Sequence, residues 1–176
     1  MILSRHKIIS KKGHELASGA ALLRRRAHYL RQRGQQLARA LDHQLPDIYT
    51  TGEFAATAYR FVTQLNENAK TLAHYQVVPE MNHNEISAIP NTRRTHFVLL
   101  RAKPEHLQVS RRFEFLKHVM GHGKYSEEWF LTKTRIENML LMLQLANYTS
   151  YFLALRYDQD PNAIPLITKL REALAR

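Results

Sequence analysis

The feature that most constrains this 176-residue chain is an apolar run within Thr95–Arg101, read as THFVLLR. A strand with apolar residues at consecutive positions, rather than at alternate ones, is typical of a parallel sheet that is covered on both faces. Parallel strands need a long crossover between them, usually a helix. We therefore expect helices to alternate with short strands along the chain.

Helical periodicity surrounds this run on both sides. Apolar residues recur at spacings of three and four, and short β-prone runs lie between these stretches. The pattern predicts helices over about 54–73, 107–120, 136–157 and 160–174, and further strands within 46–53, at 75–78 and at 129–131. With 44% hydrophobic residues the chain can bury one core. We predict a three-layer α/β fold, with a short, mainly parallel sheet flanked by helices.

The N-terminal stretch is unusually basic. Residues 1–40 contain ten Lys or Arg residues and one acidic residue, Glu15, and so hold +9 of the formal net charge of +11. A helical stripe begins at Glu15, and Gly34 is a candidate break. We therefore divide the chain into a basic N-terminal arm and helix, 1–33, and a main domain, 34–176. No recognised nucleic-acid motif accompanies the charge, so we do not expect a nucleic-acid partner; an acidic protein surface is the alternative.

The composition excludes several classes of protein. There is no cysteine, so a disulfide framework, a zinc ribbon and a thiol nucleophile are excluded, and a reducing cytoplasm suits the chain. Charges interrupt the first twelve residues, MILSRHKIISKK, which therefore lack the apolar core of a signal peptide. No later window approaches the roughly 20 apolar residues of a membrane span. We expect a cytoplasmic protein without a membrane partner.

Two segments are too polar for a routine core, namely Gln64–Lys70 (QLNENAK) and Pro79–Ile86 (PEMNHNEI). The first ends a predicted helix, and both a solvated helix end and a functional site stay open for it. The second lies in a long irregular stretch, 80–94, and loops of this length inside compact domains are usually functional. A zinc site at His83 and Glu85 is a weak alternative, because zinc takes three or four ligands at recognised spacings.

Together these two segments resemble the paired signature of the bifunctional phosphoglucose/phosphomannose isomerases, members of the sugar isomerase (SIS) superfamily. Glu67 and His83 are sixteen positions apart, the separation expected in that family between its base and its ring-opening histidine. Ser150–Leu155 and Asp160–Arg171 resemble the family's closing pattern. The resemblance runs from about residue 34 to the C-terminus, and it implies an SIS-like fold corresponding to the family's C-terminal domain.

The resemblance implies an aldose–ketose isomerase that converts glucose 6-phosphate or mannose 6-phosphate to fructose 6-phosphate through an enediolate, without a cofactor. Glu67 would move a proton between C2 and C1, and His83 would open the sugar ring. In this superfamily the histidine crosses a dimer interface, which implies a homodimer with composite active sites. The candidate substrate-binding residues in the two segments are Asn66, Lys70, Glu80 and Asn84.

Two further basic positions depart from the family pattern or have a second interpretation. Lys70 suits a structural ion pair as well as it suits catalysis. The catalytic lysine that the family places near its C-terminus aligns with Arg171, while Lys169 lies two residues earlier. Arginine can supply the positive charge but not transfer a proton. Both residues are therefore candidates for that catalytic role.

The resemblance also shows what this chain lacks. The family's first SIS domain, which holds the 6-phosphate, has no counterpart in residues 1–33, so a separate N-terminal SIS-domain chain is a candidate partner. Thr50 and Thr51 follow a strand and either bind an anion through backbone N–H groups or cap the next helix. The alternative function is a non-catalytic remnant that binds sugar phosphate or a protein partner.

Overall fold

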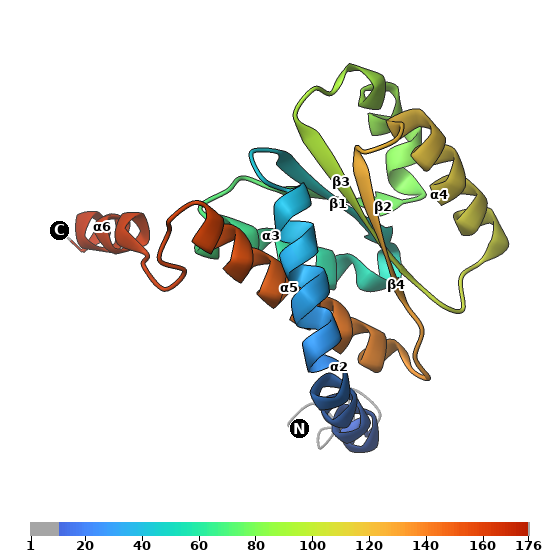
Figure 1. Ribbon diagram of the computed structural model, residues 1–176, viewed down its shortest axis with the longest axis horizontal. Coiled ribbons are helices and arrows are strands. Elements are labelled where there is room, and N and C mark those ends of the chain that lie inside the picture. The colour runs from blue at the N-terminus through green and yellow to red at the C-terminus, as the bar shows by residue number, and fades with distance from the viewer. Residues whose placement is uncertain (1–10, 176) are drawn as a thin grey trace.

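Four parallel strands form a single sheet in the order β2-β1-β3-β4 (Figure 1). The computed structural model describes residues 11–175 of the chain. The strands are β1 (Leu45–Thr51), β2 (His74–Val78), β3 (Thr95–Ala102) and β4 (Tyr125–Phe130). The α-helices are α2 (Gly13–Ala40), α3 (Ala55–Asn68), α4 (Leu107–Met120), α5 (Arg135–Arg156) and α6 (Pro165–Leu174). Short 3₁₀ turns are η1 (Gly52–Phe54), η2 (Glu80–His83), η3 (Glu85–Ser87) and η4 (Ile89–Asn91).

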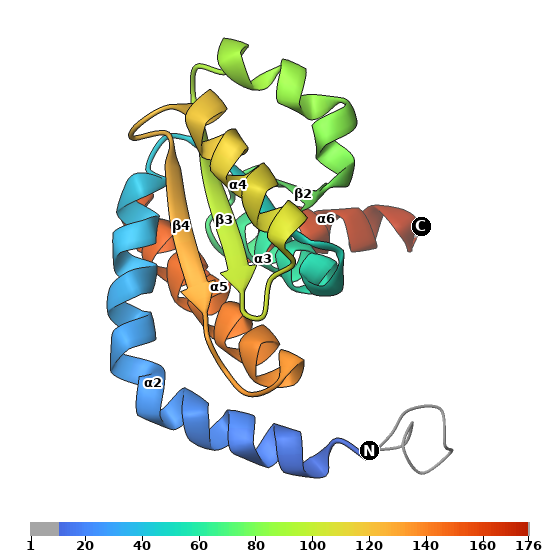
Figure 2. The same cartoon turned by 90° about the vertical axis from the view of Figure 1, so that its right-hand side faces the viewer.

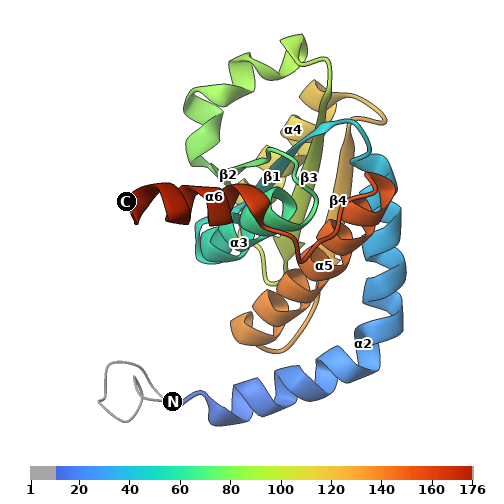
Figure 3. The same ribbon diagram turned by 90° about the vertical axis from the view of Figure 1, so that its left-hand side faces the viewer.

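Helices cover both faces of the sheet, as the views from the two sides show (Figures 2 and 3). One core cluster joins α2, α3 and α5 to one face and includes Leu37, Phe61, Val98 and Leu145. The other face is covered by α4 and by the segment of 3₁₀ turns, around Met81, Ile89, Phe97 and Phe113. The predicted three-layer α/β fold with a short parallel sheet is therefore confirmed.

The predicted elements are present, with different ends where side chains or turns intervene. The helix α4 has the predicted bounds, and Gly121, with a φ of 79°, follows it in the left-handed region that favours glycine. The helix α3 stops at Asn68 instead of continuing to residue 73, because Lys70 adopts a φ of 56°. The terminal helix begins at Pro165, whose fixed φ suits a first helical position.

The candidate break at Gly34 is wrong, because α2 runs through this glycine as one helix. The boundary drawn between residues 33 and 34 thus falls inside α2, while residues 1–10 of the basic arm lie outside the described residues. Gly34 lies against Tyr148 of α5, so the missing side chain lets the two helices approach closely. Arg33 anchors the same turn by an ion pair of 2.6 Å to the buried Glu128 of β4.

The helices of the described part, residues 11–175, include none with both the length and the apolar character required to cross a bilayer.

The close approach of α2 and α5 predicts opposite effects for two glycine substitutions in the same helix. A Cβ at Gly34 would lie 2.5 Å from Tyr148 Cβ and 3.1 Å from the Thr149 backbone nitrogen. We expect Gly34→Ala to lower the free energy of unfolding by about 1–3 kcal/mol, since backbone must move. Gly19→Ala is the matched control, because it meets the mobile end of Leu140. It should be neutral or gain up to about 1 kcal/mol from helix propensity. Urea denaturation measures both, and equal effects would contradict the packing argument.

Candidate functional site

Glu67 lies at the exposed end of α3, just before the chain enters β2. It lines an open groove of about 500 Å³, together with Asn66 and Lys70. The rest of the groove is largely apolar and comes from the loop after α3 and the start of α6, namely Leu72, Ala163, Ile164, Pro165, Leu166 and Ile167. One chain therefore supplies a polar corner with a carboxylate beside an uncovered apolar wall.

The Lys70 ammonium group is held by main-chain oxygens rather than by a carboxylate. Its Nζ donates to the carbonyl oxygens of Glu67 at 2.6 Å, Asn68 at 3.4 Å and Asp160 at 3.2 Å. An ammonium group has three N–H donors, so these bonds occupy all of them. Lys70 thus closes the end of α3 and ties it to the chain leading into α6.

His83 lies at the opposite end of β2 from Glu67. Glu67 precedes the amino end of this strand, whereas His83 follows its carboxyl end in η2 and is exposed. Moreover, α3 covers one face of the sheet and the segment of 3₁₀ turns covers the other. His83 is not among the residues that line the groove at Glu67, so one chain does not bring the two together.

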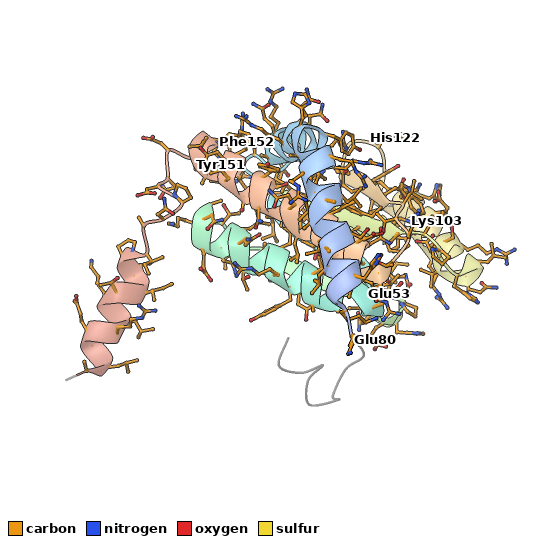
Figure 4. All side chains as sticks on the ribbon, turned by 90° about the horizontal axis from the view of Figure 1, so that it is seen from below. Glu53, Glu80, Lys103, His122, Tyr151 and Phe152 are labelled. Atoms are coloured by element: carbon orange, nitrogen blue, oxygen red, sulfur yellow. The ribbon has the colours of Figure 1, made fainter. Side chains whose placement is uncertain are left out.

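Two other predicted site residues, Glu80 and Asn84, belong to the same segment as His83. Glu80 begins η2 and is exposed, and Figure 4 labels it together with Glu53, which follows the carboxyl end of β1. The side chain of Asn84 accepts a hydrogen bond from the backbone N–H of Glu85 and so caps η3. Asn84 therefore has a local structural role, although its side chain is exposed.

Lys169 and Arg171 lie on α6, beyond the residues that line the groove. This helix projects from the body of the domain (Figures 1 and 2). All of its described residues are exposed, including Leu166 at 76% and Leu174 at 77%. The structure of the single chain thus does not bring either cation to Glu67, and it leaves an apolar helix face uncovered.

Thr50 and Thr51 are both withdrawn from solvent contact at their hydroxyl groups. The Thr50 side chain is fully buried, and its Oγ1 donates a hydrogen bond of 2.9 Å to the Leu100 carbonyl oxygen. The Thr51 Oγ1 is buried as well, and it forms no capping bond at η1. The expected cap is therefore wrong. Neither hydroxyl group is open to a phosphate. Anion binding through the backbone N–H groups of this turn stays a prediction.

A charged network that the sequence did not reveal fills the carboxyl edge at β3 and β4. The fully buried guanidinium group of Arg101 bonds to Glu105, to Glu114 at 2.8 Å and to Glu127 at 2.6 Å. It also lies 4.1 Å from the ring centroid of Trp129. Ligands of parallel sheets commonly bind at this edge. Here the guanidinium group bonds to side chains of its own chain, and we therefore assign it a structural role.

No group of three or more His, Asp or Glu side chains that could hold a metal ion is present in residues 11–175.

A family model described as the bacterial phospho-glucose isomerase C-terminal SIS domain matches residues 31–174. The chain belongs to this family. A bifunctional phosphoglucose/phosphomannose isomerase from Aquifex aeolicus is 28% identical over 176 residues, which cover 92% of this chain and 52% of the relative. One from Thermoplasma volcanium is 30% identical over 132 residues, covering 74% and 43%. This SIS-domain chain thus spans about half the length of these relatives.

Two solved structures share the fold of this SIS domain. A glucose-6-phosphate isomerase-like protein from Thermus thermophilus superposes with a TM-score of 0.63 at 21% identity, covering 76% of this chain and 46% of that one. A glucosamine-6-phosphate deaminase from Thermotoga maritima gives a TM-score of 0.66 at 11% identity, covering 90% and 50%. The predicted SIS-like fold is confirmed by the family match and by these superpositions.

The buried network predicts a large difference between two substitutions of its cations. Arg101→Met removes the guanidinium group and leaves Glu105, whose side chain is 3% exposed, without a cation. We expect a loss of about 3–5 kcal/mol in the free energy of unfolding, the usual cost of breaking a buried ion pair. Lys117→Met is the control at the rim, because Arg101 still binds Glu114 and Glu127. Its cost should stay near 1 kcal/mol or below. Urea unfolding of both variants tests this, and comparable losses would be the contrary result.

Proposed function

We propose that this chain is the catalytic C-terminal half of an aldose–ketose isomerase that converts glucose 6-phosphate or mannose 6-phosphate to fructose 6-phosphate. The observation that supports it best is the placement of Glu67 at the polar corner of an open groove. The family match over residues 31–174 and the names of the relatives support the chemistry. Glu67 acts as the base that moves a proton between C2 and C1.

Under this proposal His83 opens the sugar ring in the site of a second copy of the chain. The two faces of the sheet support this arrangement, because α3, which carries Glu67, covers one face and the segment of 3₁₀ turns, which carries His83, covers the other. A two-fold dimer would pair each Glu67 with the partner's histidine. The substrate-binding role of Asn66 is supported by its place in the groove, and that of Glu80 by its exposure beside His83.

The 6-phosphate is then held mainly by a second SIS domain, for which a separate N-terminal SIS-domain chain is the candidate partner. Three observations support this part: Lys70 uses its donors on backbone oxygens, the hydroxyl groups of Thr50 and Thr51 are buried, and the chain spans about half of its relatives. Docking of that domain against the groove would also bring a partner to α6. We propose that Lys169 or Arg171 then supplies the positive charge that stabilises the enediolate.

Isomerase activity of the chain is expected only with an N-terminal SIS domain present. Fructose 6-phosphate formation from each substrate is measured for the chain alone and after addition of an N-terminal domain from a relative. Replacing the base by Glu67→Gln should lower kcat by about 10²–10⁴-fold. Glu53→Gln is the matched control, since Glu53 forms an exposed ion pair with Arg135 away from the groove. Folded protein without turnover in either mixture would leave the non-catalytic alternative.

Composite sites predict that two inactive variants restore activity when they are mixed. In a heterodimer of Glu67→Gln and His83→Gln chains, one site carries both changes and the other carries neither. Random pairing makes half of the dimers mixed, so activity should return to about a quarter of the wild-type value. The control mixes Glu67→Gln with the double variant, which can form no intact site. Recovery is followed by turnover after refolding together, and no recovery would exclude a histidine supplied in trans.

A further inference from the structure

The segment that carries His83 packs on a face of β1 that holds a buried carboxyl group, and it brings a half-buried one of its own. Asp47 and Tyr49 point to the same face of β1, because side chains two positions apart in a strand share a face. Asp47 is 6% exposed and Tyr49 is fully buried. Glu85 of η3 interacts with both side chains from above this face. The neighbouring side chains of the same core are apolar, namely Val78, Met81, Ile89 and Phe97.

Three oxygen atoms of this cluster are buried without a hydrogen-bond partner. They are Asp47 Oδ1, Tyr49 Oη and Glu85 Oε2. Ionised carboxylates only accept hydrogen bonds, so a contact between two of them is repulsive and leaves these atoms unsatisfied. A single proton between the carboxyl groups turns the same contact into a hydrogen bond. One shared proton therefore explains the contact and the unpartnered oxygen atoms of the two carboxyl groups.

The electrostatic surroundings favour keeping this proton. Burial, followed by the charge of Glu85, raises the pKa of Asp47 to about 8. Burial also raises the pKa of Tyr49 far above its usual range, so its hydroxyl group remains neutral. The titratable group opposite Asp47 on β2 is His74, which is exposed, and its neighbour on β3 is Phe97. The facing side of α4 contributes Phe113 and Leu116. No cation is among the causes of the shift.

We propose that Asp47 and Glu85 share one proton and that this hydrogen bond fastens the segment 80–91 to β1, which makes Asp47 a positioning residue for His83. The segment is held at its two ends by the buried Met81 and Ile89, while His83 and Asn84 between them are exposed. Glu85 is thus its central polar anchor. The importance of this hydrogen bond for catalysis rests on the proposed function of His83. The fastening of the segment to β1 does not depend on that function.

The shared proton has a definite consequence for the pH dependence of stability. Asp47 keeps its proton up to about pH 8 in the folded chain but loses it near pH 4 in the unfolded chain. The folded state therefore binds one more proton between these values. The contribution of this group to stability is complete below about pH 4, falls between about pH 4 and pH 8, and is constant above. Opening of the segment is therefore increasingly favoured as the pH rises from about 4 to about 8, because the open segment releases the proton.

Carbon-13 NMR of the side-chain carboxyl groups tests the shared proton directly. In the wild-type chain, the carboxyl group of Asp47 should titrate near pH 8. In Glu85→Gln, the midpoint of Asp47 should fall by about one pH unit or more, because the neighbouring charge is gone. Glu80→Gln is the matched control, since it removes an exposed carboxylate from the same segment. Titration of Asp47 below about pH 6 in the wild-type chain would overturn the proposal.

Hydrogen exchange of residues 82–87, corrected for the intrinsic pH dependence of exchange, tests the fastening. Opening of the wild-type segment should increase by up to about tenfold per pH unit between about pH 4 and pH 8, the limit for loss of one proton, and should level off above about pH 8. Asp47→Asn should abolish this increase, because the amide donates to Glu85 at every pH. Steep opening in Asp47→Asn as well would refute the role of Asp47. If Asp47→Asn does not fold, Glu85→Gln takes its place in the same measurement. It also removes the repulsion between carboxylates, so the increase of segment opening with pH should be smaller.

Neither readout requires turnover. An inactive chain with both expected results would reject the proposed isomerase function and leave the fastening intact. An active chain in which Asp47 titrates below about pH 6 would reject the fastening and leave the proposed isomerase function intact.

Discussion

The parallel direction of all four strands is the constraint on which the rest of this structure depends. Each strand must be followed by a connection that returns to the amino edge of the sheet before the next strand begins. The connection between β1 and β2 ends with Glu67, at the amino edge. The connection between β2 and β3 begins at the carboxyl edge with the segment that carries His83. Glu67 and His83 therefore belong to different connections, one before β2 and one after it, and these connections cover opposite faces of the sheet.

The elements that could be predicted from the sequence are those in which one physical signal dominates. The run at β3 is buried on both faces, and α4 has a regular apolar period and a glycine at its end, so both were predicted almost to the residue. The prediction failed at Gly34, where the glycine does not break α2 because it allows contact with Tyr148. That contact joins residues far apart in the sequence, and local propensity contains no information about it.

The same distinction applies to the candidate site: sequence motifs predict some of its residues, whereas contacts between residues far apart in the sequence determine the others. The motifs identified Glu67 and His83, and the family match supports the interpretation on which those choices rest. The partners of Lys70, Thr50 and Arg101 could not be predicted, because each depends on a distant carbonyl or carboxyl group. The pairing of Asp47 with Glu85 needs the second crossover to fold back over β1. Isolated polar residues in the sequence thus gave no sign of whether they served structure or chemistry.

The exposure of Glu67 is the strongest physical reason to regard the single chain as part of a larger site. A carboxylate base is effective when water is excluded around it and the substrate is held within hydrogen-bond reach. In the single chain Glu67 is exposed beside an apolar wall, and the adjoining face of α6 is uncovered. A protein surface that covered this wall would bury apolar area and exclude water from the carboxylate at the same time. Assembly and activation of the base would then be one event, driven by the hydrophobic effect.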